Sequence, residues 1–378
     1  MFRRLFANAV LFAAVLGGAL VLSAAPAAAD FQSGWQAYQR GDYATALKDW
    51  RPLAARSHAR SQYQLGIMYD QGRGVPRDPA EAIRWWTKAA QLGYVEAQHI
   101  VAQAYFYGNR VKQNDKRAFR WFEKAAKQGY AKSQYTLGKM HEYGLGVPKD
   151  QAGAFSWFKK AAEAGMDKAQ YNVGKLLRDG RGTPKDAAQG IRWWTKAAVQ
   201  GYAKAQHGLG LAYISGKNVE RDYGQAMDWL NKASDQGNLE SQYTIGKMYQ
   251  SGLGVEKDQA RAFSWIKKAA EAGSAKAQYS LGNLYRDGEG APKDRKAAIR
   301  WYRSAAEAGY AKAQNHIGMR LARGEGMAKN EVEGLMWLTL AAKQKDRAAI
   351  NNRMALANTL APDKVAEATR LAKEWKPK

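Results

Sequence analysis

Apolar and small residues recur with a period of 36 along most of this chain. In the stretch "SQYQLGIMY", which begins at position 61, the larger apolar residues are spaced so that a helix would bury them together: Tyr63, Leu65, Met68 and Tyr69. A glycine-containing loop and a second amphipathic stretch complete each unit. The pattern therefore predicts eight helix hairpins over residues 57–343.

Other residues recur in register and define the ends and contacts of these helices. The small residue at Gly66 predicts that a neighbouring helix crosses close by, and Gly72 predicts a helix end with positive φ. Asp78 and its equivalents predict N-caps of the second helices. Tryptophan recurs at one position in the second helix of each hairpin, and we expect these residues in the core: Trp85, Trp121, Trp157, Trp193, Trp229, Trp265, Trp301 and Trp337.

A single hairpin of this kind cannot bury its apolar face alone, so neighbouring units must stack. The sequence therefore predicts an all-α fold, an α-solenoid of about eight 36-residue helix hairpins. Residues 30–56 read as a shorter N-terminal capping hairpin with its turn at Gly41. Residues 344–378 read as C-terminal capping helices, with Val365, Ala368, Leu371 and Trp375 on one side of the second.

The recurring pattern A-x-A-Q-Y-x-L-G-x-x-Y-x-x-G-x-G-V-x-x-D, followed by A-x-x-W-x-x-K-A-A and a glycine, resembles the Sel-1-like repeat family, relatives of the tetratricopeptide repeats. The resemblance covers residues 57–343. It implies a right-handed superhelix that acts as an adaptor or scaffold. Secreted bacterial members are often linked to envelope signalling, exopolysaccharide control, cell-wall assembly or host interaction. Cysteine-rich members described as binding or hydrolysing β-lactams carry a disulfide in each repeat, and this chain has no cysteine.

The first 29 residues have the pattern of a secretory signal peptide. Arg3 and Arg4 precede a long apolar run, which ends in small residues at Ala27 and Ala29. We expect cleavage after Ala29 and a periplasmic or secreted mature chain, without stable membrane insertion. Since the apolar run reaches about 20 residues, a retained membrane anchor is the alternative.

The chain is strongly basic, with 59 Lys and Arg against 34 Asp and Glu and a net charge of +25. Loss of Arg3 and Arg4 with the signal peptide would leave +23. Such a field attracts acidic partners but does not determine the fold. Because the signal peptide argues against nucleic acid, the candidate partners are an acidic or extended protein and an anionic glycan. A solvated basic surface without a particular ligand is the alternative.

The sequence offers little catalytic or metal-binding chemistry. Five histidines lie in different units: His58, His99, His141, His207 and His316. Three of them, His99, His141 and His207, replace a tyrosine of the repeat. They have no converging acidic or cysteine partners, so no metal or other cofactor is expected. The chain has no H-E-x-x-H, phosphate-binding loop or G-x-S-x-G motif. We therefore expect a protein that is not an enzyme, with a cell-wall-directed hydrolase as the weakest alternative.

The positions of the first helix that vary between units share one face. In tetratricopeptide-like stacks this face lines the concave surface, so we expect a basic groove with aromatic steps. Its predicted partner-binding residues are Phe106, Tyr107, Lys139, Tyr143, Lys175, Arg178, Lys247, Asn283 and Arg286. An ordinary solvated face is the alternative to this groove. The groove would suit an extended acidic peptide, and an anionic cell-wall or capsular polysaccharide is the second candidate ligand.

Two loops depart from the repeat, because Arg110 and Asn218 replace the second glycine. Asparagine tolerates positive φ better than arginine, so the Arg110 loop is predicted to take a different shape. Taken together, these features predict a non-enzymatic, periplasmic protein-binding scaffold. We expect such a scaffold to regulate envelope signalling or assembly.

Overall fold

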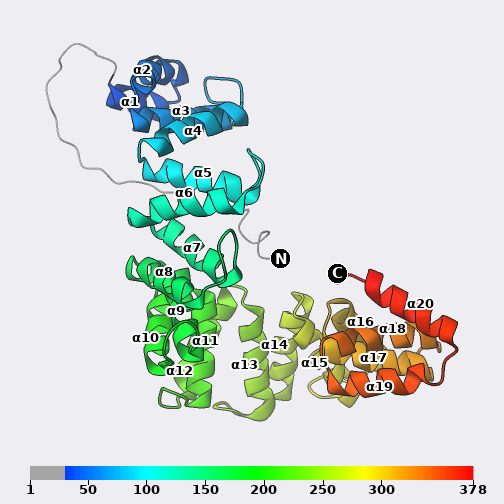
Figure 1. The fold of residues 1–378 in the computed structure, drawn as a ribbon. Coiled ribbons are helices and arrows are strands. Elements are labelled where there is room, and N and C mark those ends of the chain that lie inside the picture. The colour runs from blue at the N-terminus through cyan, green and yellow to red at the C-terminus, as the bar shows by residue number, and fades with distance from the viewer. Residues whose placement is uncertain (1–29, 378) are drawn as a thin grey trace. The chain divides into compact units, whose positions relative to one another are not determined.

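The computed structural model describes residues 30–377, which contain twenty helices and no strand (Figure 1). The first ten are α1 (Phe31–Gln39), α2 (Tyr43–Ala55), α3 (Ala59–Gln71), α4 (Pro79–Gln91), α5 (Val95–Tyr107), α6 (Asp115–Lys127), α7 (Ala131–Tyr143), α8 (Gln151–Glu163), α9 (Asp167–Asp179) and α10 (Ala187–Val199). The others are α11 (Ala203–Ser215), α12 (Tyr223–Asp235), α13 (Leu239–Ser251), α14 (Gln259–Glu271), α15 (Ala275–Asp287), α16 (Arg295–Glu307), α17 (Ala311–Arg323), α18 (Glu331–Lys343), α19 (Arg347–Ala357) and α20 (Pro362–Glu374).

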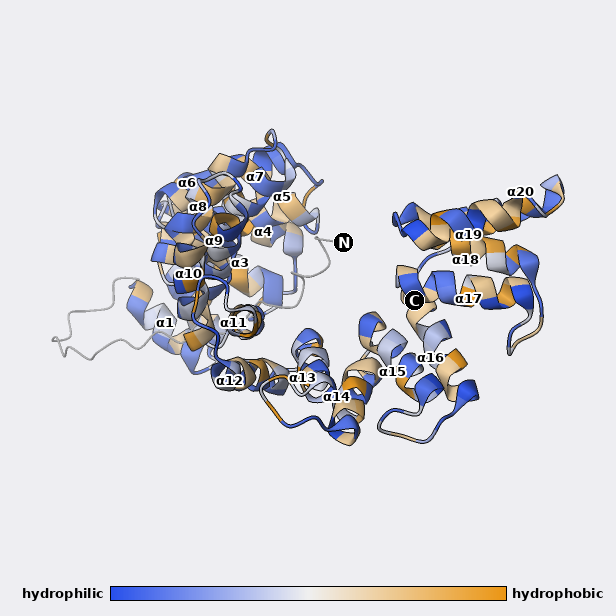
Figure 2. Cartoon of the chain, turned by 90° about the horizontal axis from the view of Figure 1, so that it is seen from below, coloured by the Kyte–Doolittle hydropathy of each residue, from blue (hydrophilic) through white to orange (hydrophobic). Residues whose placement is uncertain are grey.

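The described chain divides into two compact units, an N-terminal unit up to Trp193 and a C-terminal unit from Trp194. Within each unit, helices that follow one another pack together, as α3 does with α4 and α4 with α5. Hydrophilic and hydrophobic residues are distributed along the helices of every repeat (Figure 2). The fold is therefore an all-α solenoid, and within each unit the repeats bury their apolar faces against their neighbours.

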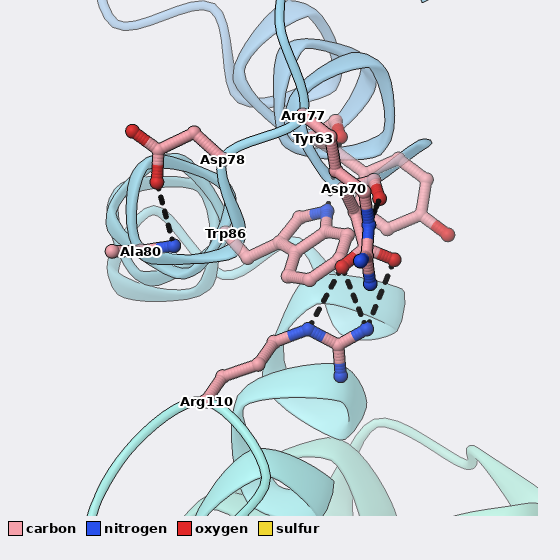
Figure 3. A network of polar contacts seen from close by, with 7 residues as sticks. All are labelled: Tyr63, Asp70, Arg77, Asp78, Ala80, Trp86 and Arg110. Atoms are coloured by element: carbon pink, nitrogen blue, oxygen red, sulfur yellow. Dashed lines mark hydrogen bonds and ion pairs between the residues drawn. The ribbon is translucent and has the colours of Figure 1, made fainter. Parts of the chain in front are cut away.

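The helix ends lie where the glycines and aspartates predict them. Gly72 has φ 68°, and its N–H donates to the carbonyl oxygen of Met68 at the end of α3. At the start of α4, Oδ1 of Asp78 accepts from the backbone N–H groups of Ala80 and Glu81, each at 2.9 Å. Figure 3 shows the bond from Ala80. These caps satisfy backbone groups that a helix end leaves unpaired, and the predicted boundaries are confirmed.

As predicted, a close helix crossing is found at glycines in the middle of six first helices: Gly66, Gly138, Gly210, Gly246, Gly282 and Gly318. A Cβ at Gly138 would lie 2.6 Å from the Phe158 ring, and one at Gly282 would lie 2.6 Å from the Tyr302 ring. Real Cβ contacts are longer than this, so a side chain at either position would push the second helix away. Glycine is therefore required here by packing.

The tryptophans expected in the core are half-buried in the seven repeats before the last, and only Trp337 is buried. In at least five repeats a lysine three residues later stacks on the indole, as Lys88 does on Trp85 at 4.3 Å. The residue after each tryptophan is buried and takes the core position: Trp86, Phe122, Phe158, Trp194, Leu230, Ile266, Tyr302 and Leu338. The prediction was thus wrong by one helical position, because two adjacent bulky residues compete for the same site.

Further helices flank the eight repeats. In α2, Trp50 is fully buried, stacks on Phe31 at 5.6 Å and donates from Nε1 to the Phe31 carbonyl oxygen at 3.2 Å. At the other end, α19 and α20 pack on α18, and the Trp375 ring meets Trp337 edge-on at 5.8 Å.

The predicted signal peptide, residues 1–29, lies outside the described residues. In the part of the chain that the structure describes, no helix combines the length and the apolar character needed to cross a membrane.

Candidate binding surface

The predicted groove residues divide between the two units, with six in the N-terminal unit and three in the C-terminal unit. Phe106 does not reach the surface. Only 3% of it is exposed, and it packs with Ala118 and Phe122 in the core between α5 and α6. The expectation of an aromatic step at this position is therefore corrected: burial against neighbouring apolar residues is more favourable for the ring than contact with water. Its neighbour Tyr107 is half-buried, and Tyr143 is 50% exposed.

Acidic neighbours offset much of the positive charge along these first helices. Nζ of Lys139 lies 2.8 Å from Glu142 and 3.4 Å from Oδ1 of Asn172. Arg178 pairs with Asp179 at 2.8 Å. Lys175 is half-buried. The basic character of the predicted groove is thus weaker than a list of its lysines and arginines indicates.

The three groove residues of the C-terminal unit are also engaged. Lys247 donates to Gln250, and Asn283 accepts a hydrogen bond from the Tyr302 hydroxyl at 2.8 Å. Arg286 makes two hydrogen bonds to the Asp287 carboxylate, at 2.8 and 2.7 Å.

A cavity of about 330 Å³ opens on the first helices of the N-terminal unit, and we call it the aromatic cavity. Residues from α3, α5, α6 and α7, from the start of α9 and from the positions just before α7 and α9 line it. They are Tyr63, Glu96, His99, Ile100, Gln103, Tyr107, Phe122, Tyr130, Lys132, Tyr135, Thr136, Met166 and Lys168. Of the predicted groove residues, only Tyr107 lines this cavity.

The repeat itself explains why the aromatic cavity forms. Tyr63, His99 and Tyr135 occupy the same slot of three successive first helices, so stacking places their rings in a row. Tyr130 stands immediately before α7 and lies 4.9 Å from the His99 ring. The recurring A-x-A-Q-[Y/H] motif carried this signal, but sequence reasoning treated the slot as core and missed its second role.

Burial keeps the polar groups of the aromatic cavity uncharged near neutral pH. It raises the pKa of the Tyr63, Tyr107 and Tyr130 hydroxyls. It also lowers the pKa of His99 to about 3, with Lys132 adding to the effect. Nδ1 of His99 is hydrogen-bonded to the Ser133 hydroxyl at 2.8 Å. The cavity therefore offers ring faces and neutral hydrogen-bonding groups, with the charges of Glu96, Lys132 and Lys168 around them.

No cluster of three or more His, Cys, Asp or Glu side chains that would hold a metal occurs within residues 30–377. The chemistry of the aromatic cavity is that of a binding surface, because ring faces and a few polar groups recognise a ligand by shape and hydrogen bonding.

Comparisons with known proteins place this architecture. The Sel1 repeat model matches eight consecutive segments, residues 59–94, 95–130, 131–166, 167–202, 203–238, 239–274, 275–310 and 311–346. The chain therefore belongs to the Sel1 repeat family. Proteins of this family generally serve as protein-interaction scaffolds and are typically non-catalytic. The eight repeats predicted from the sequence are confirmed, with limits that differ by two or three residues.

Two solved structures share the fold along most of the chain. A Sel1 repeat protein from Oxalobacter formigenes is 30% identical, covers 91% of this chain and 98% of its own, and has a TM-score of 0.66. A protective antigen of uropathogenic Escherichia coli strains, c5321, is 28% identical over 91% of this chain and 83% of its own, with a TM-score of 0.62. The chain matches no curated protein sequence.

Proposed function

We propose that the protein is a non-enzymatic scaffold of the bacterial periplasm that regulates envelope signalling or assembly. It binds an extended segment of an envelope protein on the first helices of its N-terminal unit. The aromatic cavity is the observation that supports this proposal. Its volume and its mixture of rings and polar groups suit an apolar or aromatic side chain of a partner. The signal-peptide pattern of residues 1–29 supports the location.

Charge around the aromatic cavity favours an acidic segment. Lys132 and Lys168 are exposed at the starts of α7 and α9, next to the rings, whereas Glu96 is the single carboxylate that lines the cavity. A partner residue in the cavity, flanked by acidic residues, would meet both lysines. Tyr143, half-exposed beyond the cavity, and the predicted groove residue Lys175 would extend the contact along the same helices.

The test is a crosslinking pull-down from envelope extract with the mature chain and two charge-reversed variants. Lys132→Glu with Lys168→Glu should abolish recovery of a defined partner protein. The control, Lys204→Glu with Lys312→Glu, changes the equivalent exposed positions of two repeats in the C-terminal unit and should retain it. Equal recovery by both variants would refute the proposed site. Recovery of glycan in place of protein would favour the polysaccharide ligand and overturn the protein-scaffold proposal.

The location has its own test. The protein purified from fractionated cells should be found in the periplasm, and its intact mass should correspond to a chain that starts at Asp30. A full-length mass in the membrane fraction would instead show that the apolar segment is retained as an anchor.

A further inference from the structure

A second cavity, of about 400 Å³, lies in the C-terminal unit between α15, α16, α17 and the loop that follows α17. Three guanidinium groups line it, those of Arg286, Arg295 and Arg320, against the single carboxylate of Glu325. We call it the arginine pocket. Ala298 and Ile299 supply part of its apolar wall.

The ion pairs around the arginine pocket leave two positive charges without a carboxylate partner. Asp287 holds Arg286 through two hydrogen bonds, and Arg323 lies 3.4 Å from Glu325. Arg295 makes no hydrogen bond or ion pair with any residue between 30 and 377, and Arg320 has no acidic partner there. The charge of the pocket is therefore close to +2, from Arg295 and Arg320.

Arg320 stands at a position that the other seven repeats bury as an apolar residue. Its equivalents are Met68, Ala104, Met140, Leu176, Ala212, Met248 and Leu284, all buried. A guanidinium at such a position costs stability unless its hydrogen bonds are satisfied. Core packing in the other repeats shows that the fold does not need a charge here, so the charge requires another explanation.

Two contacts fix the orientation of the Arg320 guanidinium. Its Nε donates to Nε2 of His316 at 2.8 Å, and Nη1 donates to the Glu325 carbonyl oxygen at 3.3 Å. Burial, together with Arg320 and Arg286, lowers the pKa of His316 to about 4, so the imidazole is neutral and can accept this bond. Neither contact neutralises the guanidinium, which is held in place and keeps its charge.

We propose that the arginine pocket binds the phosphate monoester group of a small molecule. A guanidinium fork matches the geometry of phosphate oxygens, and two unneutralised arginines balance the double negative charge of a phosphate monoester. The volume is that of a small-ligand site, and Ala298 and Ile299 can contact the carbon part of the ligand. This site lies in a different unit from the aromatic cavity and does not depend on the proposed partner.

Isothermal titration calorimetry of the mature chain at fixed ionic strength tests the proposal, with glycerol 3-phosphate and inorganic phosphate as probes. Saturable binding of the monoester should weaken at least tenfold in Arg320→Leu, which introduces the residue found at position 284. It should also weaken in Arg295→Gln, which introduces the residue found at positions 151 and 259. Since both substitutions copy other repeats, the variants should fold, and thermal unfolding followed by circular dichroism verifies this.

Arg300→Gln is the matched control for Arg295→Gln. Arg300 is an exposed arginine of α16, the helix that carries Arg295, and it does not line the pocket. It should bind glycerol 3-phosphate as the unmodified chain does. An equal loss in the control, or binding unchanged in Arg295→Gln, would show only a general attraction to the basic surface and overturn the proposal. So would the absence of saturable binding. Succinate binding as tightly as the monoester would reassign the pocket to dicarboxylates.

Discussion

Single substitutions within one repeat slot change what the slot does, while the backbone stays the same. The slot of Tyr63 holds a tyrosine in some units and a histidine at His99 and His207. His99 is 7% exposed and touches the Phe122 and Tyr130 rings. An imidazole in such surroundings resists protonation, because a buried charge would lose its hydration.

His99 should make folding sensitive to acid. Its folded pKa is about 3, below the value of about 6.5 in an unfolded chain, so the unfolded state binds the proton first as pH falls. Stability is therefore fully present above about pH 6.5 and declines between there and pH 3. His99→Tyr should lessen the loss between pH 7 and pH 5 by about 2 kcal/mol. Urea unfolding at both pH values measures this.

His207→Tyr provides the comparison for that measurement. His207 occupies the same slot and bonds Ser241 at 3.0 Å, but it is half-buried, and Glu240 raises its pKa against the larger lowering effect of burial. Its replacement should change the acid sensitivity less than replacement of His99. An identical effect of both substitutions would show that burial does not control the titration.

At the scale of loops and helices, an arginine in place of the second loop glycine gives the loop after α5 a contact with the preceding repeat. Asn218 takes φ 66°, as the glycines do at this position, whereas Arg110 does not have positive φ. The predicted difference between these loops is confirmed. Arg110 instead donates two hydrogen bonds to Oδ1 of Asp70 and one to Oδ2, at 2.7 to 2.9 Å (Figure 3). Its guanidinium lies 5.3 Å from the Trp86 ring, so the loop of one repeat is attached to the helices of the preceding one.

The contact between Asp70 and Arg110 should be worth more than an ordinary surface ion pair. Both side chains are less than a quarter exposed, at 21% and 23%, and the geometry is bidentate. A double-mutant cycle with Asp70→Asn and Arg110→Gln should give a coupling energy of about 1–2 kcal/mol from urea unfolding. For Arg370 and Glu374, which are about 60% exposed, the same cycle should give less than about 0.5 kcal/mol. Equal couplings would contradict the role of burial.

The sequence predicted contacts between residues that are close together in the chain, but not contacts between residues that are far apart in it. Caps such as Gly72 and Asp78 bond within a few residues, so a recurring letter identifies them. The pairing of Arg110 with Asp70 spans 40 residues and exists only once the repeats stack. The groove prediction had the same weakness: the face was derived from spacing, but the inward position of Phe106 and the hydrogen bond between Asn283 and Tyr302 depend on the packing of neighbouring helices. The aromatic cavity was missed for this reason.

For the whole molecule, the decisive question is how an array of open-ended repeats is terminated. Each repeat covers its predecessor, so the last one needs a cover that is not itself a repeat. In α18, the stretch from Gly334 to Ala341 is buried without interruption, unlike the one-sided burial of earlier second helices. α19 and α20 both pack on it. The C-terminal helices therefore complete the core of the C-terminal unit.

Trp375 should contribute measurably to this cover, because it lies just beyond α20 with its ring edge-on to Trp337 and beside the buried core of the last repeat. An edge-to-face pair adds about 0.5–1.5 kcal/mol to the gain from burial, so Trp375→Ala should lower the free energy of unfolding by about 2 kcal/mol. Lys376→Ala, at the exposed neighbour, should have no measurable effect in the same urea titrations. Because repeats are stabilised by their nearest neighbours, hydrogen exchange in Trp375→Ala should accelerate first in α18, while α3 to α6 keep their protection. Uniform acceleration along the chain would instead mean that the two units unfold as one, and that α20 stabilises more than the repeat it covers.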